Sequence, residues 1–182
     1  MKSDIATAEI AQPYAQALMS VAESKSQIEE FGEDVRSLLN LLQNSPELQN
    51  FIDNPFIEPD KKKAVISEVV GGNSYLHNFL MLLVDRRRIS LLEPICQQYV
   101  VLLRQKNQTV LAEITSAIAL SSEQEQAIRE KVIAMTKAHQ VELETKIDSD
   151  LIGGVIIKVG SQVIDASLRS QLRRLSLRLS GS

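Results

Sequence analysis

The sequence of 182 residues contains no tryptophan, and its aromatic residues amount to only 4%. So few rings leave little material for stacking nucleic-acid bases or sugars. The apolar content of 44% is nevertheless enough for a folded core, so a disordered chain is not expected. A core built mainly from Leu, Ile, Val and Ala favours packed helices.

Cysteine is as scarce, since Cys96 is alone and cannot form a disulfide within the chain. A lone thiol fits a reducing compartment. No apolar run approaches the roughly 20 residues that span a bilayer, and the first 14 residues lack the features of a secretory signal or an organelle transit peptide. We therefore expect a soluble protein that reaches a membrane only through a partner. The net charge of −3 gives no strong field for polyanions.

The first 106 residues have the periodicity of short helices. Pro13, Pro46 and Pro59 suit first helical turns, and capping-box spacing precedes a sixth helix. Because helices of this length are marginal alone, they must pack on one another. The sequence predicts an N-terminal six-helix bundle over residues 1–106. Its clearest helix carries an apolar stripe of period 3.6: Ile28, Phe31, Val35, Leu38, Leu39 and Leu42.

After residue 106 the period changes to two, which is typical of strands. Residues 110–115 and 141–147 are predicted strands, with a helix between them that begins at a Ser122–Glu125 capping box. A more central strand is predicted for residues 152–159, followed by a short return strand and a last helix. The sequence therefore predicts a mainly α protein, with a small α/β domain over residues 107–182.

Candidate catalytic groups are few. His77 and His139 lie far apart, and neither has a second ligand at metal-binding spacing. Asp148 and Asp150 could act as an acid and base pair or hold a metal, but a polar turn is the favoured interpretation. Cys96 is expected to be a buried structural thiol. We expect no enzyme activity, no cofactor and no metal.

Glycine-rich phosphate loops are not expected either. Gly153 and Gly154 are followed by apolar residues, whereas a P-loop needs a lysine and a hydroxyl there. The dinucleotide pattern G-x-G-x-x-G is absent as well. Nucleotide binding is therefore not predicted.

Two basic segments leave an alternative open. Residues 86–88 are three arginines at a helix end, where they complement the helix dipole. The last helix carries four more, and this pattern could bind phosphates or dock a partner helix. The alternative function is therefore a nucleic-acid-binding two-domain regulatory protein. The four arginines are Arg169, Arg173, Arg174 and Arg178.

Several short motifs occur in a specific order. They are YAQAL at residues 14–18, FIDNP at residues 51–55, and the segments 78–88, 146–160 and 164–169. In order and spacing the sequence resembles the delta subunit of F-type ATP synthases, which mitochondria call the oligomycin-sensitivity-conferring protein. The similarity is greatest to cyanobacterial and plastid versions.

The resemblance implies a non-catalytic stator subunit, present in one copy per complex. In this family the N-terminal domain binds the N-terminal segments of alpha subunits, and the C-terminal domain holds the b-type stalk. The stator resists rotor torque and so couples proton flow to ATP synthesis. The family works at the cytoplasmic or stromal side of an energy-coupling membrane, either a thylakoid or a bacterial inner membrane.

The resemblance also implies where the alpha segment binds, namely a groove between the first and fifth helices. The remaining motif residues are expected to make the fold. Gly153 and Gly154 would let a neighbouring element approach, Gly160 would form a hairpin turn, and Asp165 would cap the last helix. The implied groove residues are Tyr14, Ala17, Leu18 and Val21 on one wall, and Phe79, Leu80, Leu83 and Val84 on the other.

Overall fold

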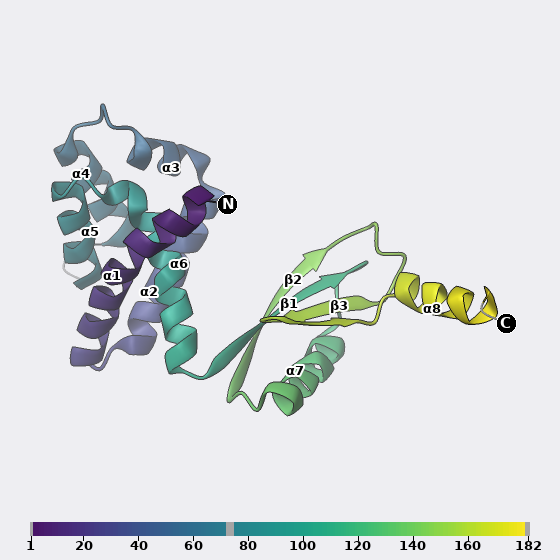
Figure 1. Cartoon of the computed structure of the whole chain (residues 1–182). Helices are drawn as coiled ribbons and strands as arrows, with labels where there is room; N and C mark the ends of the chain where they lie inside the picture. The colour runs from purple at the N-terminus through teal and green to yellow at the C-terminus, as the bar shows by residue number, and fades with distance from the viewer. Residues whose placement is uncertain (1, 72–74, 181–182) are drawn as a thin grey trace. The chain divides into compact units, whose positions relative to one another are not determined.

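The computed structural model describes residues 2–71 and 75–180, and it divides into two compact units between Leu103 and Arg104. The protein is mainly helical with one small sheet (Figure 1), as the sequence predicts. The first unit contains α1 (Lys2–Ser24), α2 (Ile28–Asn44), α3 (Pro46–Asp53), α4 (Pro59–Val70), α5 (Tyr75–Asp85), the short 3₁₀ helix η1 (Ile89–Leu91) and all but the last three residues of α6 (Leu92–Lys106).

Two of the three prolines expected at helix starts lie there, and the third lies inside a helix. Pro46 and Pro59 occupy the first turns of α3 and α4, where the missing N–H removes no hydrogen bond. Pro13, however, lies inside α1 rather than at its start. The helix extends to earlier residues, and Ala11 on that extension is fully buried in the core. The prediction of a helix start at Pro13 is therefore wrong.

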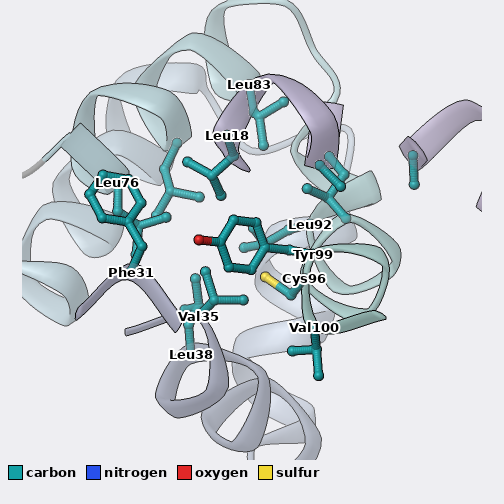
Figure 2. Close-up of a cluster of buried hydrophobic side chains, with 14 of the residues drawn as sticks. Leu18, Phe31, Val35, Leu38, Leu76, Leu83, Leu92, Cys96, Tyr99 and Val100 are labelled. Carbon is teal, nitrogen blue, oxygen red and sulfur yellow. The ribbon is translucent and has the colours of Figure 1, made fainter. Parts of the chain in front are cut away.

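The core of the first unit surrounds Tyr99, which has no exposed surface. Figure 2 shows its ring among Leu18, Val35, Leu92 and other apolar side chains. The Tyr99 hydroxyl has no hydrogen-bond partner within the described part of the chain. Burial, together with the charges of nearby glutamates, raises the pKa of Tyr99 to about 12.

The second unit is a four-stranded sheet in the order β2-β1-β3-β4. Its strands β1 and β2 are parallel, and β3 is antiparallel to both β1 and β4. The connection between β1 and β2 is α7, as a parallel pair requires a crossover. The elements are β1 (Thr109–Ser116), α7 (Ser122–Thr136), β2 (Gln140–Ile147), β3 (Val155–Val159), β4 (Gln162–Asp165) and α8 (Leu168–Ser180).

Helix α7 covers one face of this sheet (Figure 1) and closes the second core. Its Ile128 and Val132 pack against Ala112 and Ile114 of β1. The other face carries polar pairs, such as the Lys158–Glu113 ion pair at 2.9 Å. The alternation of period two predicted this division correctly.

The capping box of α7 lies one residue earlier than predicted. Ser121 caps the helix, because its hydroxyl accepts a 3.3 Å hydrogen bond from the Gln124 backbone N–H. Gln124 Oε1 in turn accepts from the Ser121 backbone N–H at 2.9 Å. Adjacent serines and adjacent Glu and Gln residues give two registers of the same motif, and the sequence alone does not choose between them.

Candidate functional site

Helices α1 and α5 lie side by side in opposite directions. Arg88, just after α5, donates a hydrogen bond to the Tyr14 hydroxyl in the middle of α1, and its guanidinium carbon lies 5.5 Å from the Tyr14 ring centroid. At the other end, Lys25 Nζ after α1 lies 5.0 Å from the ring centroid of Tyr75, the first residue of α5. The two cation–π contacts therefore join α1 to both ends of α5.

Four of the eight predicted groove residues are not available at the surface of this pair. Leu18, Leu80, Leu83 and Val84 are between 0% and 3% exposed and belong to the core. Leu80, Leu83 and Val84 lie on α5, which is apolar on nearly all sides, so the apolar pattern alone cannot separate its core face from an outer face. The four buried residues do not contribute to the exposed surface of the α1–α5 pair, and we correct their placement.

The other four lie at or near the surface. Ala17 and Val21 are exposed, and Tyr14 and Phe79 are half-buried. Spacings of three and four residues place these side chains on one face of each helix. The structure adds three exposed apolar residues that the sequence analysis missed. We call the whole set the α1–α5 strip: Ile10, Tyr14, Ala17, Val21, Tyr75, Phe79 and Leu82.

One end of the α1–α5 strip is basic. Tyr14 and Leu82 line a depression of about 420 Å³ together with Arg86 and Arg88. Arg86 and Arg88 are both exposed. The strip therefore combines exposed apolar side chains with positive charge at one end, which suits an amphipathic helix with an acidic end.

A second exposed apolar patch lies in the second unit. Ile152, Leu168 and Leu172 are 67%, 44% and 57% exposed. The Leu168 backbone N–H donates to the Gly153 carbonyl oxygen at 2.9 Å, which brings the start of α8 beside Ile152. Leu172 follows one helical turn later. We call these three residues the α8 patch.

The paired glycines hold the start of α8 against the loop before β3. They lie outside the strand, because β3 begins at Val155 and Gly154 has a φ of +82°. The prediction that they lie inside a strand is wrong, since this φ interrupts the ladder. Close approach is what Gly154 provides, because a β-carbon there would lie within 3 Å of the backbone at Ala166 and Ser167.

Gly160 and Asp165 shape the neighbouring turns. Gly160 has a φ of +57° in a two-residue hairpin closed by the Val159–Gln162 pair. Asp165 is not the cap of α8, because Ser167 holds that position and its Oγ accepts from the Ser170 backbone N–H at 3.3 Å. Asp165 supports the cap, since its carboxylate accepts from the Ser167 N–H at 2.9 Å and from the Ser170 hydroxyl at 2.5 Å.

Comparison with known proteins gives one family. A family model described as the ATP synthase delta (OSCP) subunit matches residues 10–179. This chain belongs to the ATP synthase delta (OSCP) subunit family. It is 67% identical to the ATP synthase subunit delta of Trichormus variabilis over the full length of both chains. It is 53% identical to that of a Synechocystis species over 98% of each.

A solved structure has the same fold as this delta-family chain. It comes from a hexamer of the mitochondrial ATP synthase of Toxoplasma gondii and superimposes with a TM-score of 0.72. The two sequences are 25% identical, and the match covers 93% of this chain and 96% of the other. The predicted resemblance, including its cyanobacterial character, is confirmed.

The residues that the sequence analysis considered for catalysis have structural roles in the delta-family chain. The Asp148 carboxylate accepts from the Asp150 backbone N–H at 3.0 Å, which forms a polar turn. Cys96 is 2% exposed, and burial raises the pKa of its thiol to about 12. Among residues 2–71 and 75–180, no three His, Cys, Asp or Glu side chains gather in a way that could hold a metal ion.

Two arginines of α8 donate hydrogen bonds to nearby backbone carbonyl oxygens in this delta-family chain. Arg169 donates to the Asp150 carbonyl oxygen at 2.8 Å, and Arg174 donates to the Ser170 carbonyl oxygen at 3.2 Å. The side chain of Arg178 lies outside the described residues. The family match gives no support to the nucleic-acid alternative.

Proposed function

We propose that this chain is a peripheral-stalk (stator) subunit of an F-type ATP synthase and acts without catalysing a reaction. It links the catalytic head to the b-type stalk and resists the torque of the rotor, so that proton flow is coupled to ATP synthesis. The family match over residues 10–179 carries this proposal. One copy per complex would suffice for a link of this kind.

The first unit is the proposed head-binding domain, in which α1 to α6 form a six-helix bundle. Its α1–α5 strip receives the N-terminal segments of alpha subunits. Exposed apolar residues at helical spacing on two adjacent helices form the kind of surface on which an amphipathic helix docks. Ala17 lies in the middle of the strip, and its small side chain lets the guest backbone come close.

The second unit is the proposed stalk-binding domain, and the α8 patch is its contact with the b-type subunits. An exposed apolar patch rimmed by charged residues is typical of a protein-binding surface. Arg169 and Arg173 are exposed beside this patch and add positive charge at its rim.

We place the protein at the cytoplasmic or stromal side of a thylakoid or bacterial inner membrane, held there by the complex. Within the described ranges, none of the helices is both long and apolar enough to traverse a bilayer. The b-type stalk would supply the attachment.

Co-purification tests this proposal. A tagged chain is isolated from detergent-solubilised membranes, and its partners are identified by mass spectrometry. We expect alpha and b-type subunits at fixed ratio to one copy of this chain. Leu82→Asp should lose the alpha subunits first, and Leu172→Asp the b-type subunits first. Recovery of nucleic acid without either subunit would favour the alternative function.

A further inference from the structure

The first unit has a second depression, which shares no residue with the α1–α5 strip. It has a volume of about 400 Å³ and lies beside the loop between α3 and α4. Ile52, Phe56, Lys62 and Arg87 are among its lining residues. We call it the Lys62 pocket. Its size is within the range of sites that bind ligands or peptide side chains.

Lys62 is a buried cation that its surroundings satisfy only in part. Its side chain is 7% exposed, and Nζ donates to the Ile52 carbonyl oxygen at 2.5 Å near the end of α3. An ammonium group has three N–H donors, and this bond uses one. Lys62 forms no ion pair with a residue in the described ranges. A charge buried in this way favours an anion beside it.

Arg87 adds a second cation to the lining. It has a φ of +53° and closes α5, because its own N–H donates to the Val84 carbonyl oxygen at 2.9 Å and the Arg88 N–H to the Leu83 carbonyl oxygen at 2.8 Å. This position usually holds glycine. The chain therefore has an arginine at the pocket, although the backbone conformation there favours glycine.

The carboxylates of the lining do not neutralise both cations. Glu58 lines the pocket but pairs with Lys61 on the surface, at 3.2 Å. Asp53 is the other lining carboxylate. Counted together with Lys61, three cations therefore stand against two carboxylates at the pocket, and the local excess charge is positive.

Phe56 places an apolar ring at the rim. Its side chain is 93% exposed, although the loop that carries it is held by hydrogen bonds. The Phe56 N–H donates to Asn54 Oδ1 at 2.9 Å, which forms an Asx turn. An exposed aromatic ring on a hydrogen-bonded loop can serve as an anchor in a protein interface.

We propose that the Lys62 pocket binds an acidic segment of another polypeptide of the assembled complex. A carboxylate of that segment accepts hydrogen bonds from Lys62 and Arg87, and a neighbouring apolar side chain packs on Phe56. Charge complementarity and the exposed ring together select this occupant. This proposal rests on the proposed function in one respect, namely that the partner belongs to the ATP synthase complex.

Photo-cross-linking in the assembled complex tests this. Phe56→p-benzoylphenylalanine places a photoreactive group at the rim, and Leu82→p-benzoylphenylalanine does so in the α1–α5 strip. After irradiation, mass spectrometry maps each cross-linked peptide. We expect position 56 to link to a single segment of another subunit, with an Asp or Glu within about four residues, roughly one helical turn.

Three further variants in the position-56 background test the charge. Lys62→Met and Arg87→Gly should each lower the cross-link yield at position 56 about fivefold or more, because each removes a cation from the pair. Arg87→Gly keeps the fold, since glycine suits that φ. Arg36→Met is the matched control, because Arg36 is exposed on α2 and does not line the pocket. It should leave the yield unchanged.

Five results would overturn the proposal. A cross-link at position 82 without one at position 56 would remove the pocket partner and leave the proposed function standing, whereas no cross-link at either position would count against both. A cross-link to a segment without an acidic residue, or to a second copy of this chain, would contradict the stated partner. Stabilisation by inorganic phosphate that Lys62→Met abolishes, without a cross-link, would show a small-anion site instead.

Discussion

A β-carbon on Gly154 would lie 2.4 Å from the carbonyl oxygen of Ala166 and 2.9 Å from the Ser167 Cα. Both contacts are with backbone, which cannot move aside without displacing the start of α8. The φ of +82° at Gly154 disfavours any side chain as well. By contrast, a β-carbon on Gly153 would meet only the side chain of Leu168, at 2.7 Å.

Replacing Gly154 should therefore cost far more than replacing Gly153. Gly154→Val is expected to destabilise the second unit by about 3 kcal/mol or more, since strained φ and backbone overlap add together. Gly153→Ala is the matched control and should cost about 1 kcal/mol, because the half-exposed Leu168 side chain can turn away. Calorimetric melting of both variants measures the difference. Equal melting temperatures would show that close approach is not the role of Gly154.

Removing the Tyr99 hydroxyl should not weaken the first unit. The hydroxyl is buried without a hydrogen-bond partner in the described ranges, and an unsatisfied buried polar group costs roughly 1–3 kcal/mol. Tyr99→Phe keeps the ring that fills the core (Figure 2) and should leave stability equal or raise it by about 1 kcal/mol. Urea unfolding provides the measurement. Tyr99→Leu is the control for the ring and should destabilise. A loss above about 1 kcal/mol in Tyr99→Phe would indicate a satisfied hydroxyl.

The support that Asp165 gives to α8 should depend on pH in a defined direction. Hydrogen bonds from Ser167, and then from Ser170, lower the pKa of Asp165 from its ordinary 3.8 to about 2. A lowered pKa in the folded state means that the stabilisation is complete above the ordinary pKa and is lost as the pH falls through about 2. A carboxyl NMR titration of the full chain should show this midpoint.

Ser170→Ala is the matched control for this titration. It removes one of the hydrogen bonds and should raise the Asp165 midpoint toward 3.8 without deleting the carboxylate. Asp165→Asn should loosen the first turn of α8 at neutral pH, seen as faster amide exchange at Ser167. A midpoint of 3.8 in the unmodified chain would contradict the hydrogen-bonded arrangement.

The sequence predicted the element types well and the outward faces poorly. Periodicity located the stripe of α2 and the alternation of β1, because each reflects which side faces a core. The groove residues that the resemblance implied on α5 were less accurate, because they included Leu80, which faces the core, and omitted Leu82, which faces outward. Hydrophobicity alone cannot distinguish a core face from a binding face, and that distinction needed the packed neighbours.

Turn geometry shows the same limit on a smaller scale. Asp165 was predicted as the cap of α8, but Ser167 takes that position and Asp165 supports it from two residues earlier. Both residues are good caps, so composition could not order them. The Lys62 pocket could not be predicted from the sequence, because its residues come from two separate segments that meet only in the folded unit.

The groove assignment can be tested at its centre. Ala17 is exposed in the middle of the α1–α5 strip, so Ala17→Asp should leave the fold intact and place a charge where an apolar guest helix docks. Affinity for an alpha N-terminal peptide should fall at least tenfold, or about 1.4 kcal/mol. Calorimetric titration of the full chain measures this. Leu82→Asp should weaken binding by a similar factor, whereas Ser20→Asp on the same helix, at an exposed position outside the strip, should have little effect. Unchanged affinity in Ala17→Asp, with an unchanged melting temperature, would move the alpha segment away from α1.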